Sequence, residues 1–134
     1  MTTTERKRLR SPGQPVGRWI RPEKRLAINL RDHHTCLLCL KDLSSADPAD
    51  VTLDHINPKN DPVTGRKDNR ESNLYTACRS CNSSRQDKPL KRFASGEALK
   101  HIRRNVKRSL KPYLKLAKAY FADQVGAEET IVNR

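Results

Sequence analysis

Two pairs of cysteines, with Asp, His and Asn side chains between and beside them, are the residues of this chain that could do chemistry. Cys36 and Cys39 form one Cys-x-x-Cys pair, and Cys78 and Cys81 form a second. Four thiolates at this spacing suit a closed tetrahedral zinc site. Such a site leaves no open position for water, so we expect this zinc to hold the frame and not to activate a reactant.

Disulfides of a secreted domain are the alternative for the same cysteines. Residues 1–7 (Met-Thr-Thr-Thr-Glu-Arg-Lys) contain none of the apolar character of a secretory signal, so a cytoplasmic protein is expected. Cysteines in a reducing compartment bind metal more often than they pair. No apolar stretch approaches the length of a membrane-spanning helix, and no membrane partner is expected.

An Asp-His pair ends a segment of β-branched and apolar residues, Val51 to Ile56, which predicts a short strand. A neutral imidazole such as His55 is the usual base near neutral pH. An oxygen ligand such as Asp54 suits a hard cation such as Mg²⁺. An isolated pair of this kind is more often a half-buried histidine beside a turn residue, so the pair needs support from its surroundings.

That support comes from the order of the motifs. Cys-x-x-Cys is followed by Leu-Asp-His-Ile-Asn-Pro at 53–58, Ser-Asn-Leu at 72–74 and Cys-x-x-Cys-Asn-x-x-Arg at 78–85. This series resembles the HNH endonuclease family, in its zinc-containing branch, over roughly residues 31–88. The resemblance implies a small α+β fold with a ββα-metal core stapled by the four-cysteine zinc site. Flanking helices and a basic C-terminal helix, which lie outside the resemblance, complete the expected fold. A free-standing chain of this size is similar to HNH proteins of phages.

The resemblance also implies roles for four side chains. His55 matches the general base, and Asp54 before it matches a ligand of the catalytic divalent ion. Asn73 matches the central asparagine, which positions the base or the metal loop. Asn82 matches the second metal ligand, where many members carry His. Because an amide oxygen is a harder ligand than imidazole, Mg²⁺ or Mn²⁺ is the expected catalytic ion.

The net charge of +13 and the pI near 10.1 imply a polyanionic partner, and double-stranded DNA is the expected one. Residues 88–118 hold eleven Lys or Arg against one Glu. Arg85, one helical turn after Asn82, is expected either to touch a phosphate or to lie on a solvated helix face. The other cations expected to contact DNA are Arg79, Lys59, Arg103, Arg104, Lys107 and Lys111. Whether the chain forms a homodimer or joins a larger assembly is left open.

Periodicity predicts the flanking helices. Pro22 and Glu23 favour a helix that ends near Asp32, with Leu26, Ala27 and Leu30 on one face and Ile28 opposite, covering the first cysteine pair. Apolar residues at 3–4 spacing from Leu99 to Phe121 predict an amphipathic helix, which Pro112 should kink or split near residues 110–111. Residues 57–72 form a polar loop.

The predicted organisation is a disordered basic arm (1–18), an HNH domain with its zinc knuckles (19–95), a basic amphipathic helical extension (96–125) and a tail (126–134). The predicted function is metal-dependent hydrolysis of DNA phosphodiester bonds, by nicking or cutting with low intrinsic sequence specificity. One alternative is a non-catalytic zinc-ribbon module that binds nucleic acid. Another is a basic interaction or membrane-surface protein driven by the C-terminal helix.

Overall fold

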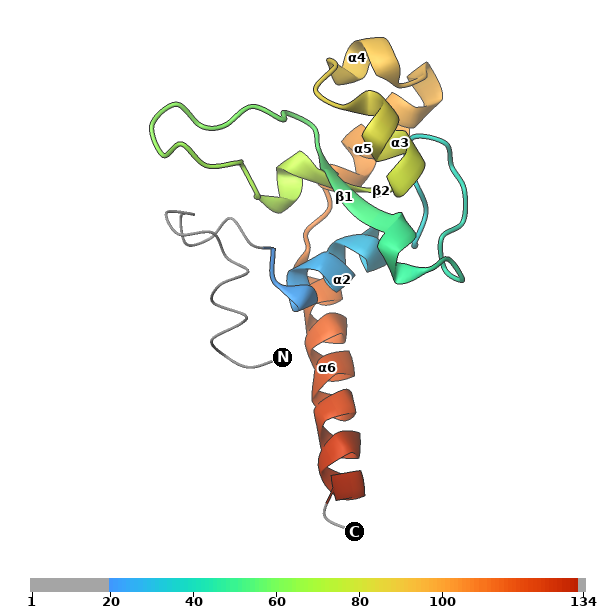
Figure 1. Ribbon diagram of the computed structural model, residues 1–134, viewed down its shortest axis with the longest axis vertical. Coiled ribbons are helices and arrows are strands. Elements are labelled where there is room, and N and C mark those ends of the chain that lie inside the picture. Colours follow the sequence, from blue (N-terminus) through green and yellow to red (C-terminus); the bar gives the residue numbers. More distant parts are fainter. Residues whose placement is uncertain (1–19, 133–134) are drawn as a thin grey trace.

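The computed structural model describes residues 20–132, with side chains described for residues 20–124. The predicted N-terminal arm therefore lies outside the described residues. Figure 1 shows a two-stranded sheet at the centre, short helices around it and one long helix that leads away from the body. No helix in the described part of the chain is long and apolar enough to cross a membrane.

The sheet and the helix after it form the predicted ββα core. Strands β1 (Val51–His55) and β2 (Leu74–Cys78) pair antiparallel, with Val51 opposite Cys78 and His55 opposite Leu74. Helix α3 (Arg79–Arg85) follows β2 directly, and the Cys78 sulfur caps it by accepting a hydrogen bond from the Cys81 amide. The small α+β fold with a ββα core is thus confirmed.

The two faces of the sheet carry different apolar clusters, because successive strand residues point to opposite sides. Leu53 and Leu74 pack with Ala27 and Ile28 of helix α2 (Pro22–Arg31) and with residues of helix α6 (Lys111–Val132). The other face carries Tyr75 and Ala77 and is covered by the cysteine knuckles and by helices α4 (Leu90–Phe93) and α5 (Gly96–Val106). Short 3₁₀ turns, Pro48–Asp50 and Glu71–Asn73, lead into the two strands.

Helix α2 differs from the prediction in what it buries. Ile28 is fully buried with Ala27, whereas Leu26 and Leu30 are only partly buried. The helix packs on α6 and β2 and does not cover the first knuckle. The reason is that Leu110, just before α6, and Ala117 within it supply the apolar surface on which α2 packs, far along the sequence from α2.

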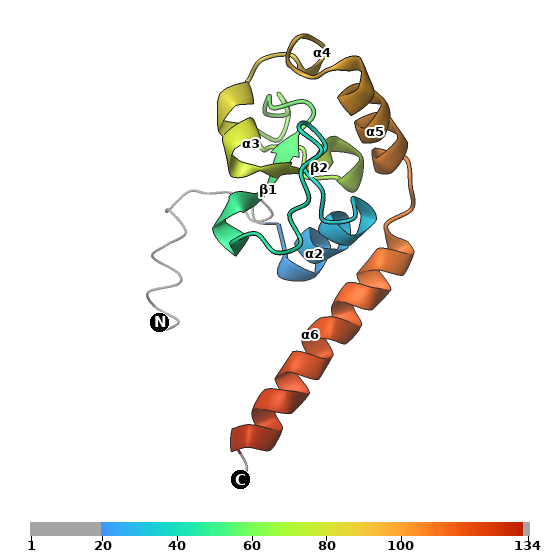
Figure 2. The ribbon, with the colours of Figure 1, turned by 90° about the vertical axis from the view of Figure 1, so that its right-hand side faces the viewer.

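The C-terminal region splits where proline predicts a break. Helix α5 ends at Val106, and α6 begins at Lys111 with Pro112 in its first turn, where the missing proline N–H costs no hydrogen bond. The apolar stripe is buried at Ile102, Leu110 and Ala117, but Tyr120 is 53% exposed, because α6 has by then left the body (Figure 2).

Candidate active site

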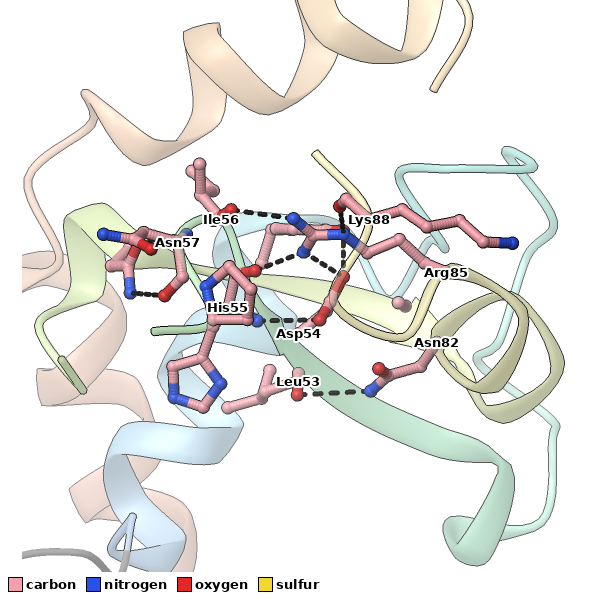
Figure 3. Close-up of polar contacts among 12 residues, drawn as sticks. Leu53, Asp54, His55, Ile56, Asn57, Asn82, Arg85 and Lys88 are labelled. Atoms are coloured by element: carbon pink, nitrogen blue, oxygen red, sulfur yellow. Dashed lines mark hydrogen bonds and ion pairs between the residues drawn. The ribbon is translucent and has the colours of Figure 1, made fainter. Parts of the chain in front are cut away.

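The carboxylate of Asp54 is buried at the end of β1 on the face that α3 covers. Its Oδ1 accepts a hydrogen bond from the His55 amide (2.9 Å), and its Oδ2 accepts one from Arg85 Nη1 (2.9 Å) and one from the Tyr75 hydroxyl. Figure 3 shows this carboxylate turned toward Arg85. A carboxylate offers about four lone-pair positions, so one acceptor position, on Oδ1, remains for a ligand.

Arg85 has no exposed surface, and its guanidinium is used entirely inside the protein. Nε donates to the carbonyl of Lys88 (2.8 Å), Nη1 donates to Asp54 and to the carbonyl of His55, and Nη2 donates to the carbonyl of Ile56 (2.8 Å). The prediction that Arg85 contacts a phosphate or lies on a solvated face is therefore wrong. Its side chain instead fixes the backbone directly after the candidate base (Figure 3).

Asn82 lies one turn before Arg85 on α3 and faces the same strand. Its amide nitrogen donates to Thr52 Oγ1 (3.0 Å) and to the carbonyl of Leu53 (3.4 Å). These bonds orient the side chain through its nitrogen, so the amide oxygen is the atom that can act as a ligand. Asp54 and Asn82 together offer a carboxylate oxygen and an amide oxygen, which fits a hard cation such as Mg²⁺ that keeps several of its waters.

His55 occupies the opposite face of the same strand end. Its backbone is held by Arg85, while its half-buried imidazole reaches the loop between the strands, where Nε2 lies 2.7 Å from Oδ1 of Asn69. The base candidate and the ligand candidate thus flank the tip of β1 from two sides. A phosphate at this tip could meet an ion on one side and an imidazole on the other.

Asn73 closes the loop that follows the candidate base. Its Oδ1 accepts from the Asn57 amide (2.9 Å), and its Nδ2 donates to the carbonyls of Asn57 (3.2 Å) and Asp68 (2.8 Å). The backbone of Asn73 adds a bond from the Ile56 amide (2.9 Å). One buried amide therefore clamps both ends of residues 57–68, and its contacts are with the backbone of the loop rather than with the imidazole.

Two ionisable groups near the site have strongly displaced pKa values. The hydrogen bond from the Arg70 side chain lowers the pKa of Asp68 to about 2, so this carboxyl is negatively charged at neutral pH. Burial, and then the hydrogen bond to Asp54, raises the pKa of Tyr75 far above its ordinary value. The Tyr75 hydroxyl therefore stays protonated and keeps donating to Asp54.

The four cysteines converge at the other end of the sheet. Their sulfurs all lie within 4.8 Å of one another, and all four are free thiols. Zinc–sulfur bonds of about 2.3 Å in a tetrahedron require sulfurs about 3.8 Å apart, so the cluster can close on one zinc ion. The amides of Cys39 and Cys81 donate to the sulfurs of Cys36 and Cys78, each at 3.4 Å.

The charge of the four cysteine thiolates also favours a bound zinc ion in this cluster. Burial, and then a hydrogen bond with Cys78, raises the pKa of the Cys81 thiol well above its ordinary value. Several negative thiolates packed this closely would repel one another, and a divalent cation removes that penalty by binding them directly. The four-cysteine cluster fits a structural zinc ion, and no His of the described chain joins it.

The remaining predicted DNA contacts are all exposed. Arg79 opens α3, and Lys59 lies in the loop after the base. A second group lies on α5, on the connection to α6 and at its start: Arg103, Arg104, Lys107 and Lys111. Helix α5 packs on β2, so these cations belong to a different side of the molecule from α3.

Sequence reasoning missed two contributors to the site. Tyr75 faces Asp54 directly across the sheet, and the strand register could have revealed it. Asn69 carries no signal of its own, because it lies in a loop whose path the sequence pattern does not define.

Comparison with known proteins gives one finding on family. The model of the family described as HNH endonuclease matches residues 36–88, which include both cysteine pairs, both strands and α3. Neither the curated proteins nor the solved structures contain a match to the chain.

Proposed function

We propose that this chain is a metal-dependent endonuclease that hydrolyses phosphodiester bonds of double-stranded DNA, and the match of residues 36–88 to the HNH endonuclease family is the premise. One observation carries the proposal. The tip of β1 presents an imidazole on one face, and on the other a carboxylate with one free acceptor position beside an amide oxygen.

His55 has the role of general base in this proposal. Its imidazole takes a proton from a water molecule, the water oxygen attacks phosphorus, and the bond from phosphorus to the 3′ oxygen breaks. The products are a 5′ phosphate and a 3′ hydroxyl, whose proton comes from solvent. Arg85 and Asn73 hold the backbone at the base and directly after it, which fixes the imidazole relative to the strand tip.

Asp54 and Asn82 would hold the catalytic ion, Mg²⁺ or Mn²⁺. A divalent ion supplies positive charge that stabilises the transition state and the departing oxygen. Because Arg85 already neutralises Asp54, the protein part of this site has no net charge. We therefore expect weak metal binding without DNA and tighter binding once a phosphate adds its own negative oxygen.

Lys59, Arg79 and the cations of α5 and of the start of α6 would bind the DNA backbone. Contacts to phosphates carry no sequence information, so low intrinsic specificity and a strong dependence on salt follow. The division into a nuclease domain (19–95) and a basic extension (96–125) belongs to the same proposal. Ala98 and Ile102 are buried, so α5 is packed onto the nuclease core.

Nicking of supercoiled plasmid by zinc-loaded protein tests this function. Wild type is compared with His55→Ala in Mg²⁺, in Mn²⁺, in Ni²⁺ and without added metal, with the zinc content of each protein measured. We expect metal-dependent nicking that falls about 100-fold or more in His55→Ala, the size of a general-base contribution.

The matched control is His33→Asn, which removes an exposed imidazole from a left-handed position (φ 56°) that Asn tolerates. This variant should nick like wild type. Equal nicking by wild type and His55→Ala would remove His55 from the role of base. DNA binding without cleavage in any metal would favour the zinc-ribbon binding module.

A further inference from the structure

The imidazole of His55 forms a hydrogen bond with the side chain of Asn69. The two residues are 14 positions apart, and Nε2 of His55 lies 2.7 Å from Oδ1 of Asn69. A side-chain carbonyl oxygen can only accept a hydrogen bond, so the hydrogen between these atoms belongs to Nε2. A neutral imidazole has one N–H, and the nitrogen left with a lone pair is therefore Nδ1.

The backbone that carries Asn69 is fixed from three directions. Asn73 Nδ2 donates to the carbonyl of Asp68 (2.8 Å), Lys24 Nζ donates to the carbonyl of Asn69 itself, and Arg31 Nη1 donates to the carbonyl of Glu71 (3.0 Å). Loop carbonyls usually face water. Three side chains on three neighbouring carbonyls hold this short segment at a set distance from the imidazole.

Two of these three side chains come from outside the matched domain. Lys24 and Arg31 lie on α2, and the HNH match begins at residue 36. Arg31 is fully buried, so its bond to Glu71 is part of the core. Helix α2 therefore contributes to the candidate active site through the loop, in addition to packing on α6.

We propose that Asn69 is the positioning residue of the general base. It accepts the Nε2 hydrogen of His55, holds the ring in one orientation and in one tautomer, and makes Nδ1 the atom that takes the proton from water. The inference rests on the proposed nuclease function for its role in hydrolysis. The contact and the tautomer themselves can be measured without any cleavage.

The test is nitrogen NMR of the His55 ring in the zinc-loaded full chain, combined with nicking assays, for wild type, Asn69→Asp and Asn69→Ala. Wild type should show hydrogen on Nε2 and none on Nδ1. Asn69→Asp keeps an accepting oxygen at this position, so the hydrogen should stay on Nε2.

The two variants distinguish a role of Asn69 in orienting the His55 ring from a role in the stability of the protein. Asn69→Asp should therefore nick DNA close to the wild-type level, because its carboxylate oxygen still orients the ring. Asn69→Ala should show a mixture of tautomers and nicking about 10- to 100-fold below wild type, because the ring is no longer oriented. Asn60→Ala, an exposed change in the same loop, is the control and should match wild type.

Two results would overturn the proposal. One is a hydrogen on Nδ1 of His55 in wild type. The other is an unchanged tautomer in Asn69→Ala. If wild type fails to nick DNA in any metal, the proposed function fails, while the NMR measurement still decides whether Asn69 orients His55.

Discussion

Two buried arginines, each paired with a buried aspartate, bind different strands of the same small sheet. Arg31 pairs with Asp32 at the end of α2, and Arg85 pairs with Asp54 beside the candidate base. Neither arginine has exposed surface. Both guanidinium groups also donate to backbone carbonyls, of Leu74 and Glu71 for Arg31 and of His55 and Ile56 for Arg85.

The two carboxylates differ in how completely their oxygens are used. Asp32 accepts four hydrogen bonds, two from Arg31, one from the Thr76 amide (2.8 Å) and one from Asn105 Nδ2 (3.2 Å). Asp54 accepts three, from His55, Arg85 and Tyr75. A carboxylate offers about four acceptor positions, so Asp32 is saturated and Asp54 is not.

The different number of hydrogen bonds on Asp32 and Asp54 explains how one ion pair can be purely structural while the other can also serve a metal site. Asp32 joins α2, β2 and α5 and has no acceptor position left for a cation. Asp54 also holds β1 to α3, but it keeps one acceptor position, and Asn82 of α3 faces the same strand. Burial and ion pairing alone do not distinguish these roles, whereas a count of donors on each carboxylate does.

Removal of zinc should have the largest effect, because it breaks both ion pairs at once. Strand β2 carries the Thr76 amide that binds Asp32 and the Tyr75 hydroxyl that binds Asp54, and it ends at Cys78. Structural zinc contributes on the order of 10 kcal/mol in small zinc domains. We expect chelated protein to lose its cooperative thermal transition, as measured by circular dichroism alongside zinc content. A zinc-free protein with an unchanged transition would contradict this.

Removal of each arginine should have the next largest effect on the free energy of unfolding and should distinguish the two ion pairs. Arg31→Met and Arg85→Met each leave a buried carboxylate without its partner, which costs about 3–5 kcal/mol of unfolding free energy. Mn²⁺ should recover part of the loss in Arg85→Met, because Asp54 and Asn82 can offer it two oxygen ligands. It should recover none in Arg31→Met, because the groups left on Asp32 are the N–H donors of Thr76 and Asn105, which cannot bind a cation. Binding at 100 times the dissociation constant adds about 2.7 kcal/mol.

Urea denaturation of zinc-loaded Arg31→Met and Arg85→Met, with and without Mn²⁺, measures this difference, and wild type serves as the reference. Equal recovery of the two variants by Mn²⁺ would mean that Asp54 binds the ion no better than Asp32 does, and the proposed difference between the two carboxylates would be wrong.

Removal of the neutral hydrogen-bond donor on Asp54 should have the smallest effect on the free energy of unfolding. Tyr75→Phe deletes the hydroxyl that donates to Asp54, and we expect a loss of about 1 kcal/mol in unfolding free energy. The freed oxygen position should strengthen Mn²⁺ binding several-fold, as measured by calorimetry. Asn105→Leu is the matched change at Asp32, and Mn²⁺ binding should not respond to it. Since Tyr75 stays protonated, the effect of its removal should not vary between pH 7 and pH 9.

Much of the local structure follows from the sequence alone. The spacing of the cysteine pairs predicts a cluster because four thiols at knuckle spacing have few other uses in a reducing compartment, and their sulfurs do converge. Pro22 and Pro112 stand in the first turns of α2 and α6, where their fixed geometry favours a start. The roles of Asp54, His55, Asn73 and Asn82 remain proposals.

Arg85 shows that the sequence does not predict what the face of a helix packs against. Helical periodicity correctly places Arg85 on the same face of α3 as Asn82, since the two residues are three positions apart. Periodicity does not say whether that face meets solvent or β1. It meets β1, so Arg85, which was expected to contact DNA, is buried and links α3 to the end of the strand.

The sequence by itself determines the chemical inventory of this protein: four thiols for zinc, one imidazole beside one carboxylate, two asparagines in a fixed order and a large excess of cations. The tertiary structure decides which of these groups remain free to react. Asp32 takes donors from 44 and 73 residues away, and Asp54 takes one from 31 residues away. Hydrogen bonds between such distant residues form only after the elements pack. The last free acceptor position of Asp54 and the fixed ring of His55 are therefore properties of the fold.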